Sequence, residues 1–150
     1  MTVHFAHAGL IARDPDRLAA FYVEVLGGVS EVRRLHMSGA WLDRATGIDG
    51  AEASGLHVRL PGHGADGPTI EILSYAGASG PHQASAVNDL GLGHLAFEVH
   101  DVDAVGRDIV RAGGTMVGEP ATTEIVGRGT LRVVFARDPE GNIIELLSWG

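Results

Sequence analysis

Apolar and polar positions alternate in residues 3–12, and a pattern of helical period follows them directly. The alternation is typical of a half-buried strand. Asp14 before Pro15 predicts the N-cap and first position of a helix, and Gly27 predicts its end. The apolar residues between them recur with the spacing of one buried helix face: Leu18, Phe21, Tyr22, Val25 and Leu26. The start of the chain therefore predicts a strand followed by an amphipathic helix.

The same order of patterns recurs in the second half of the chain. Residues 92–100 predict a strand, Asp101 predicts an N-cap, and residues 102–112 predict a helix. Three pairs of residues lie 87 positions apart: His7 and His94, Asp14 and Asp101, and Gly27 and Gly114. We therefore expect one structural unit that is present twice.

Three further strands are predicted after the helix in each half: 29–37, 55–60 and 69–75 in the first, and 115–117, 130–136 and 143–149 in the second. Residues 38–54 have no counterpart in the second half and predict a loop or one short helix. Residues 120–129 predict a loop. Two halves of this kind predict an α+β fold, in which the sheets form a curved, partly open enclosure with helices outside.

The boundaries follow from a stretch rich in Gly, Ser and Ala. We expect a first module at 1–78, a linker at 79–91 and a second module at 92–150, joined in one structural domain. A length of 150 residues with 45% apolar residues suits this organisation.

Charge and composition narrow the classes of function. The net charge of −8 argues against a nucleic-acid partner, and without cysteine a metal needs His, Asp, Glu or backbone oxygen as ligands. No apolar run reaches the roughly 20 residues of a membrane helix. The first residues do not resemble a signal peptide, so we expect a cytoplasmic protein that handles small molecules.

Each half places one His on its first strand and one Glu on its last. His7 and His94 occupy the first strands, and Glu71 and Glu145 lie in matching Ile-Glu-Ile and Ile-Glu-Leu contexts. A carboxylate within an apolar strand is costly unless it is paired or binds a cation. Two His and two carboxylates suit one divalent ion of Zn, Ni, Co, Mn or Fe. The alternative for each residue alone is ordinary: a satisfied His, or a Glu on the solvent face of a strand.

Four other residues are weaker candidates. Phe97 is a candidate for lining a substrate pocket, and Arg59 and Arg132 are candidates for binding a substrate carboxylate. For Phe97 the alternative is a core position, and for the two arginines it is a solvated strand face. His57 stays open between the surface and the site.

Three stretches carry a family resemblance: His7-Ala-Gly-Leu before an Asp-Pro helix start, Gly91-Leu-Gly-His94-Leu-Ala-Phe-Glu-Val, and Asp138-Pro-Glu-Gly-Asn-Ile-Ile-Glu145-Leu. Together they resemble the vicinal oxygen chelate superfamily, which includes glyoxalase I, methylmalonyl-CoA epimerase, extradiol dioxygenases, fosfomycin-resistance enzymes and bleomycin-binding proteins. The resemblance is closest to the glyoxalase I-like and epimerase-like members. It implies paired βαβββ modules, a homodimer, and metal ligands at His7, Glu71, His94 and Glu145.

The resemblance also implies a reaction. A Glu at position 71 favours the lyase or isomerase branch, which abstracts a proton next to a metal-bound carbonyl of a small oxygenated metabolite. Glu145 is then expected to act as ligand and base, and Glu71 as the second acid–base group. A basic cluster for glutathione or CoA is not evident in the sequence.

Two alternatives belong to the same superfamily. One is an Fe(II) extradiol-type dioxygenase that uses the His residues with Glu145. The other is a metal-free small-molecule binding or self-resistance protein. Members of that last kind generally lack the full ligand set, so the presence of all four residues favours an enzyme.

Overall fold

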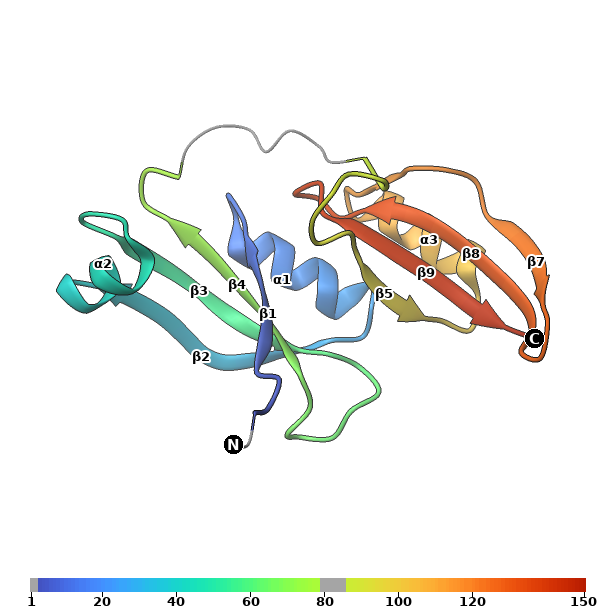
Figure 1. Cartoon of the computed structure of the whole chain (residues 1–150), viewed down its shortest axis with the longest axis horizontal. Coiled ribbons are helices and arrows are strands. Elements are labelled where there is room, and N and C mark those ends of the chain that lie inside the picture. Colours follow the sequence, from blue (N-terminus) through green and yellow to red (C-terminus); the bar gives the residue numbers. More distant parts are fainter. Residues whose placement is uncertain (1–2, 79–85) are drawn as a thin grey trace. The chain divides into compact units, whose positions relative to one another are not determined.

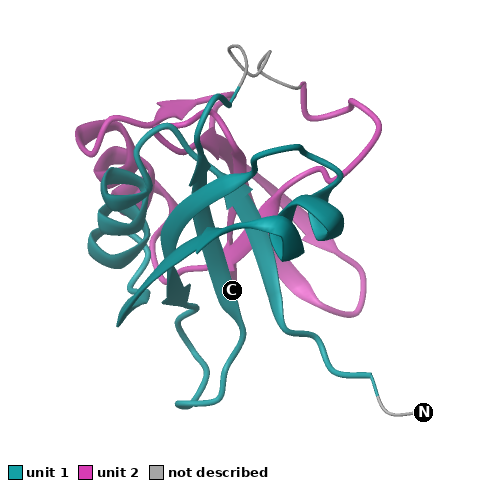
Figure 2. Cartoon of the chain, turned by 90° about the vertical axis from the view of Figure 1, so that its left-hand side faces the viewer, with its two compact units in different colours: residues 1–80 teal, residues 81–150 magenta. Residues whose placement is uncertain are grey.

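The computed structural model of the chain describes residues 3–78 and 86–150 (Figure 1). The chain divides into two compact units, Met1–Gly80 and Pro81–Gly150 (Figure 2). The predicted linker at 79–91 lies partly outside the described residues, since residues 79–85 are among those left undescribed. None of the helices in the described ranges combines the length and apolar character needed to cross a membrane.

The first unit is a four-stranded sheet with two helices. Its elements in chain order are β1 (His7–Ile11), α1 (Pro15–Glu24), β2 (Val29–Ser38), α2 (Ala40–Thr46), β3 (Glu52–Arg59) and β4 (Thr69–Tyr75). The strand order is β1-β4-β3-β2. The outer strand β1 is parallel to β4, and the other neighbours are antiparallel.

The second unit repeats this arrangement. Its elements are β5 (Leu95–Glu98), α3 (Val102–Arg111), β6 (Thr115–Met116), β7 (Ala121–Ile125), β8 (Gly129–Arg137) and β9 (Ile143–Trp149). The order is β5-β9-β8-β6, with β7 also paired to β8. The strand β5 is parallel to β9, as β1 is to β4. The predicted α+β fold of two tandem βαβββ modules is confirmed.

Two segments that were predicted as loops, 38–54 with a short helix as the alternative and 120–129, contain regular structure. The unmatched stretch 38–54 contains the short helix α2, one of the two forms expected for it. The predicted loop at 120–129 is wrong in part, because it contains β7. In the first unit β2 runs along β3 with a register shift between Ser30 and Arg34. Its counterpart in the second unit is interrupted there, and the two pieces β6 and β7 pair separately with β8.

Each sheet has one face covered by a helix. In the first unit α1 packs on β3 and β4, whose Val58, Ile70 and Ile72 are fully buried. In the second unit α3 packs on β8 and β9, where Ile144 and Leu146 are fully buried. Because side chains alternate along a strand, Glu71 and Glu145 lie on the faces away from the helices.

The helix starts and ends follow the predicted signals. Asp14 accepts a hydrogen bond from the backbone N–H of Arg17 at 3.0 Å, and Asp101 accepts one from that of Ala104 at 2.9 Å. Both are therefore N-caps.

The ends of the two helices differ by one residue from the predicted correspondence. Gly28 donates to the carbonyl of Tyr22, and Gly114 donates to the carbonyl of Ile109. Tyr22 and Ile109 are 87 positions apart, whereas Gly28 and Gly114 are 86 apart. The predicted match of Gly27 with Gly114 is therefore wrong, because the loop after α3 is one residue shorter.

A tight turn sets the start of β9. The Asp138 side chain is buried, and its Oδ1 accepts hydrogen bonds from the backbone N–H groups of Glu140 and Asn142, each at 2.9 Å. Its Oδ2 accepts from Nδ2 of Asn142 at 2.8 Å. This turn fixes the chain just before the strand that carries Glu145.

Candidate metal centre

In the first unit, Glu71 on β4 lies between a His on β1 and a His on β3. The backbone register pairs Glu71 with Gly9 on one side and with His57 on the other. His7 is two residues before Gly9, so its side chain shares their face of the sheet. Its Nε2 lies 3.4 Å from Oε2 of Glu71. The structure thus brings together the two residues of this unit that were predicted as metal ligands.

His57 adds a third donor that the sequence left open. Its Nε2 lies 3.5 Å from Oε1 of Glu71, and its Nδ1 lies 2.9 Å from the hydroxyl of Thr69. One ligand atom from each of His7, His57 and Glu71 can be chosen so that all lie within 4.8 Å of one another. The sequence contains a signal for His57, because period-two alternation places its side chain on the other face of the strand from the apolar Leu56 and Val58.

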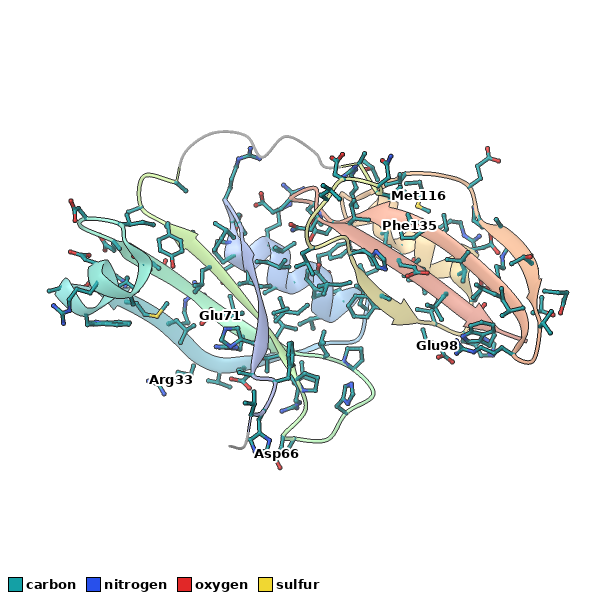
Figure 3. All side chains as sticks on the ribbon, viewed as in Figure 1. Arg33, Asp66, Glu71, Glu98, Met116 and Phe135 are labelled. Atoms are coloured by element: carbon teal, nitrogen blue, oxygen red, sulfur yellow. The ribbon has the colours of Figure 1, made fainter. Side chains whose placement is uncertain are left out.

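The second unit repeats the pair with a closer contact. His94 directly precedes β5, and its Nε2 lies 2.9 Å from Oε2 of Glu145 on β9. The register pairs Glu145 with Ala96 on β5 and with Phe135 on β8. The ring of Phe135, which is labelled on β8 in Figure 3, meets the His94 ring edge-on, with centroids 5.3 Å apart. Thus Ala96 and Phe135 stand where the first unit has Gly9 and His57.

The spacing and burial of these groups fit a divalent ion. Two ligands at about 2.0–2.2 Å from one ion, set at octahedral or tetrahedral angles, lie about 2.8–3.6 Å apart. The contacts of His7 with Glu71 and of His94 with Glu145, at 3.4 Å and 2.9 Å, fall in that range. The side chains of Glu71 and Glu145 are 19% and 18% exposed, so both carboxylates keep limited contact with solvent. Imidazole and carboxylate donors suit Zn, Ni, Co, Mn and Fe.

Each pair is described within its own unit. The first unit joins His7 to Glu71, and the second joins His94 to Glu145. That the four residues form one set of ligands stays a prediction.

Two of the three predicted substrate residues, Arg132 and Phe97, lie away from the His–Glu pair of their own unit. Arg132 donates through Nε and Nη2 to the Asp103 carboxylate on α3, at 2.9 Å and 2.8 Å, which places it on the helix side of its sheet. Phe97 is 9% exposed and alternates with Ala96, so it belongs to the core. These placements argue against the substrate roles predicted for Arg132 and Phe97. Arg59 shares the face of His57, and its Nη1 donates to the carbonyl of Ala65 at 3.4 Å.

The contact between Asp103 and Arg132 shifts the pKa of both groups. The hydrogen bond from Arg132 holds the pKa of Asp103 below its ordinary value, and in turn it raises the pKa of Arg132. Both groups are therefore charged and paired at neutral pH, and the pair ties α3 to β8.

A groove of about 480 Å³ lies beside α3 and is separate from the His–Glu pair of its unit. Val102, Gly106, Val110 and Met116 contribute apolar lining. Met116 pairs with Ala136, which is buried on the helix side of β8, whereas Glu145 lies on the other face. The groove therefore does not enclose the candidate metal ligands.

Comparisons with known proteins agree with the fold. The sequence model of the Glyoxalase/Bleomycin resistance protein/Dioxygenase superfamily matches residues 4–146. The chain therefore belongs to this superfamily, and the resemblance predicted from its motifs is confirmed.

One curated protein is similar to part of the chain. A probable lactoylglutathione lyase of Vibrio cholerae serotype O1 is 33% identical over 86 residues, which cover 57% of this chain and 56% of the relative. The chain thus spans about half the length of the curated relative it matches.

Two solved structures establish the fold. A glyoxalase family protein of Bacillus cereus is 22% identical with a TM-score of 0.82, over 100% of this chain and 97% of the other. The trypanothione-dependent glyoxalase I of Leishmania major is 23% identical with a TM-score of 0.61, over 98% of this chain and 87% of the other.

Proposed function

We propose that this chain is a divalent-metal-dependent lyase or isomerase of the glyoxalase-like kind. It would act on a small oxygenated metabolite by removing a proton from the carbon next to a carbonyl. The observation that carries the proposal is the repeated His–Glu pair, held in the same strand register in both units at 3.4 Å and 2.9 Å. Membership of the superfamily and the probable lactoylglutathione lyase relative support the same class of reaction.

His7, Glu71, His94 and Glu145 are the residues that would hold the ion. The proposal takes them as one set, which requires one ion per chain. When bound, a divalent ion supplies a Lewis acid that stabilises negative charge on a carbonyl oxygen.

Glu145 is the residue proposed to accept the proton from carbon. Its carboxylate is 18% exposed, and its Oε2 lies 2.9 Å from Nε2 of His94, so this oxygen is the one that would bind the ion beside His94. The second oxygen is then available to take the proton. Glu71, in the matching position of the first unit, is the proposed second acid–base group, which returns a proton to the substrate.

The name of the Vibrio cholerae relative supplies the first substrate to test. We propose lactoylglutathione, with related 2-oxo compounds and thioesters as the next candidates. The thioester supplies a carbonyl with a neighbouring C–H, which is the bonding pattern that the proposed proton transfer needs.

The proposal is tested with Glu145→Gln, which keeps the size of the side chain but removes its basic oxygen. We expect turnover of the accepted substrate to fall by roughly 10²–10⁴-fold. Glu31→Gln, an exposed acid on β2, is the matched control with the same change of charge. Unchanged turnover in Glu145→Gln would rule out the assigned role. Tight ligand binding that a chelator does not affect, with no product formed, would favour the metal-free binding protein.

One observation favours a second function. His7, His57 and Glu71 together are a set of two His and one carboxylate, the donor set of non-haem Fe(II) oxygenases. Oxygen uptake by the Fe(II)-loaded protein with catechol-like substrates would support an extradiol-type dioxygenase. Absence of uptake, with lyase activity present, would exclude it.

We also propose a homodimer. The strand β2 lies at an edge of its sheet, and its Val29 and Val32 are 50% and 100% exposed. Such edges pair readily with another chain. Light scattering of the purified protein should give twice the mass of the chain, and a monomer at micromolar concentration would contradict the proposal.

A further inference from the structure

The two units differ in chemistry at one pair of equivalent positions on the faces that carry the acids. His57 faces Glu71 across β3 and β4, and the same position opposite Glu145 is held by Phe135. Thr69 is two residues before Glu71, and Ile143 is two residues before Glu145. The first unit therefore has the polar pair His57 and Thr69 where the second has the apolar pair Phe135 and Ile143. Both polar members are present together in one unit and absent together in the other.

The rings at this position keep the same packing in both units. The His57 and His7 rings meet edge-on at 5.4 Å and 71°, and Phe135 meets His94 at 5.3 Å and 78°. Shape is thus conserved between the units, and the ring nitrogens of His57 are the difference. The role of His57 therefore depends on which groups its two ring nitrogens contact.

The two imidazoles of the first unit contact different oxygens of one carboxylate. His7 Nε2 is 3.4 Å from Oε2 of Glu71, and His57 Nε2 is 3.5 Å from Oε1. In the second unit His94 contacts Oε2 of Glu145, which is the arrangement of His7 without the second imidazole. The His7 side of the carboxylate is therefore common to both units, and the His57 side is specific to the first.

Thr69 sets the orientation of the His57 ring. Its hydroxyl lies 2.9 Å from Nδ1, and the His57 side chain is 20% exposed. A hydroxyl that donates to Nδ1 leaves the ring proton on Nε2, the nitrogen that faces Glu71. Such partners of a ligand commonly fix its orientation in metal sites.

We propose that His57 is a positioning residue for Glu71. The Thr69 hydroxyl donates to Nδ1, the Nε2–H of His57 faces Oε1, and Oε2 on the His7 side is thereby presented as the metal-binding oxygen. This inference rests on the proposed function, because it gives the carboxylate of Glu71 an ion to bind. It makes His57 a contact of a ligand and leaves the ligand set of the proposal unchanged.

Variants that copy the second unit test the proposal. His57→Phe introduces the ring found at Phe135, and Thr69→Ile introduces the residue found at Ile143. Thr69→Ser keeps the hydroxyl and serves as the matched control. The probe is Co²⁺, added to the metal-free full-length protein, with affinity from titration and coordination from the visible absorption spectrum. Thermal melting shows that each variant is folded.

We expect His57→Phe to weaken Co²⁺ binding roughly 10–100-fold, the usual effect of losing a partner of a ligand. The spectrum of the saturated protein should keep its shape, because the ligands are unchanged. Thr69→Ile should weaken binding in the same direction, Thr69→Ser should match the wild type, and the double variant should lose no more than His57→Phe. An unchanged affinity in His57→Phe would overturn the proposal. A changed spectrum would also overturn it, since His57 would then be a ligand.

A second measurement does not depend on the ion. Ring-nitrogen NMR shifts of His57 in the metal-free protein should show the proton on Nε2 in the wild type and in Thr69→Ser, with the preference lost in Thr69→Ile. A proton on Nδ1 of the wild type would overturn the proposal even if His57→Phe does not fold. A wild-type protein that binds no Co²⁺ would refute the proposed function instead, and the NMR result would still decide the hydrogen-bond arrangement.

Discussion

Nε2 of His94 lies 2.9 Å from Oε2 of Glu145, although 51 positions separate the two residues in the chain. The contact follows from the parallel pairing of β5 with β9, which sets Ala96 opposite Glu145 with His94 two residues earlier. The first unit repeats the register through Gly9 and Glu71. The His–Glu pair is therefore a property of the module, fixed by its strand pairing.

Gly55 is predicted to be the glycine of β3 that cannot be replaced. A Cβ at this position would lie 1.8 Å from the carbonyl oxygen of Ile72 on the neighbouring strand. We expect Gly55→Ala to lower the free energy of unfolding by roughly 3 kcal/mol, because the backbones of the two strands must move apart to make room for the Cβ. Urea denaturation of the purified variant measures the change.

Gly9→Ala is the matched control for that substitution. No atom lies within 4 Å of a Cβ at Gly9, and the second unit has Ala96 at the equivalent position. Its stability should stay within about 0.5 kcal/mol of the wild type. Equal losses in the two variants would show that the close approach at Gly55 does not limit stability.

Asp138 is predicted to hold the turn before β9. Asp138→Ala removes the acceptor of three hydrogen bonds and leaves the N–H groups of Glu140 and Asn142 without that partner. We expect a loss of roughly 2–4 kcal/mol in the free energy of unfolding. Asp138→Asn keeps one acceptor oxygen and should lose less. A loss below 1 kcal/mol in Asp138→Ala would contradict this role.

The Asp103–Arg132 pair predicts a dependence of stability on pH. Arg132 lowers the pKa of Asp103 in the folded protein, so the stabilisation is present above the unfolded pKa of about 3.9. It is lost as the pH falls through the lower folded value. Asp103→Asn should therefore melt at a lower temperature than the wild type at pH 7, and the difference should shrink below pH 4.

The control for this series is Asp49→Asn, an exposed acid outside the pair. Its melting temperature should follow that of the wild type across the same pH range. A difference between Asp103→Asn and the wild type that stays constant down to pH 2 would exclude the pair as its source.

The fold was predictable from the sequence because its signals are local. Asp14 and Asp101 are caps that bond within three residues, and the apolar alternation of β4 and β9 is visible in Ile-Glu-Ile and Ile-Glu-Leu. The strand β7 lies in a segment predicted to be a loop, because its pairing depends on register against β8 and not on local composition.

The site was predictable in part for the same reason. Duplication marked His7, Glu71, His94 and Glu145, since each recurs in an equivalent context. His57 has no counterpart in the second unit, where Phe135 stands, so duplication gave it no support. For Arg132 the sequence leaves a substrate contact and a solvated strand face open, because strand position alone does not reveal its partner Asp103, which lies 29 residues earlier on α3.

The number of metal ions bound per chain is the most direct test of the four proposed ligands. The full-length protein, loaded with Co²⁺ or Zn²⁺ and freed of excess ion, should hold one ion per chain by elemental analysis. Replacing any one of His7, Glu71, His94 or Glu145 with Ala should reduce that content, and Glu31→Ala should leave it at one. A wild-type protein that retains no ion, or variants of either His–Glu pair that retain a full equivalent, would contradict the proposal that these residues hold one ion.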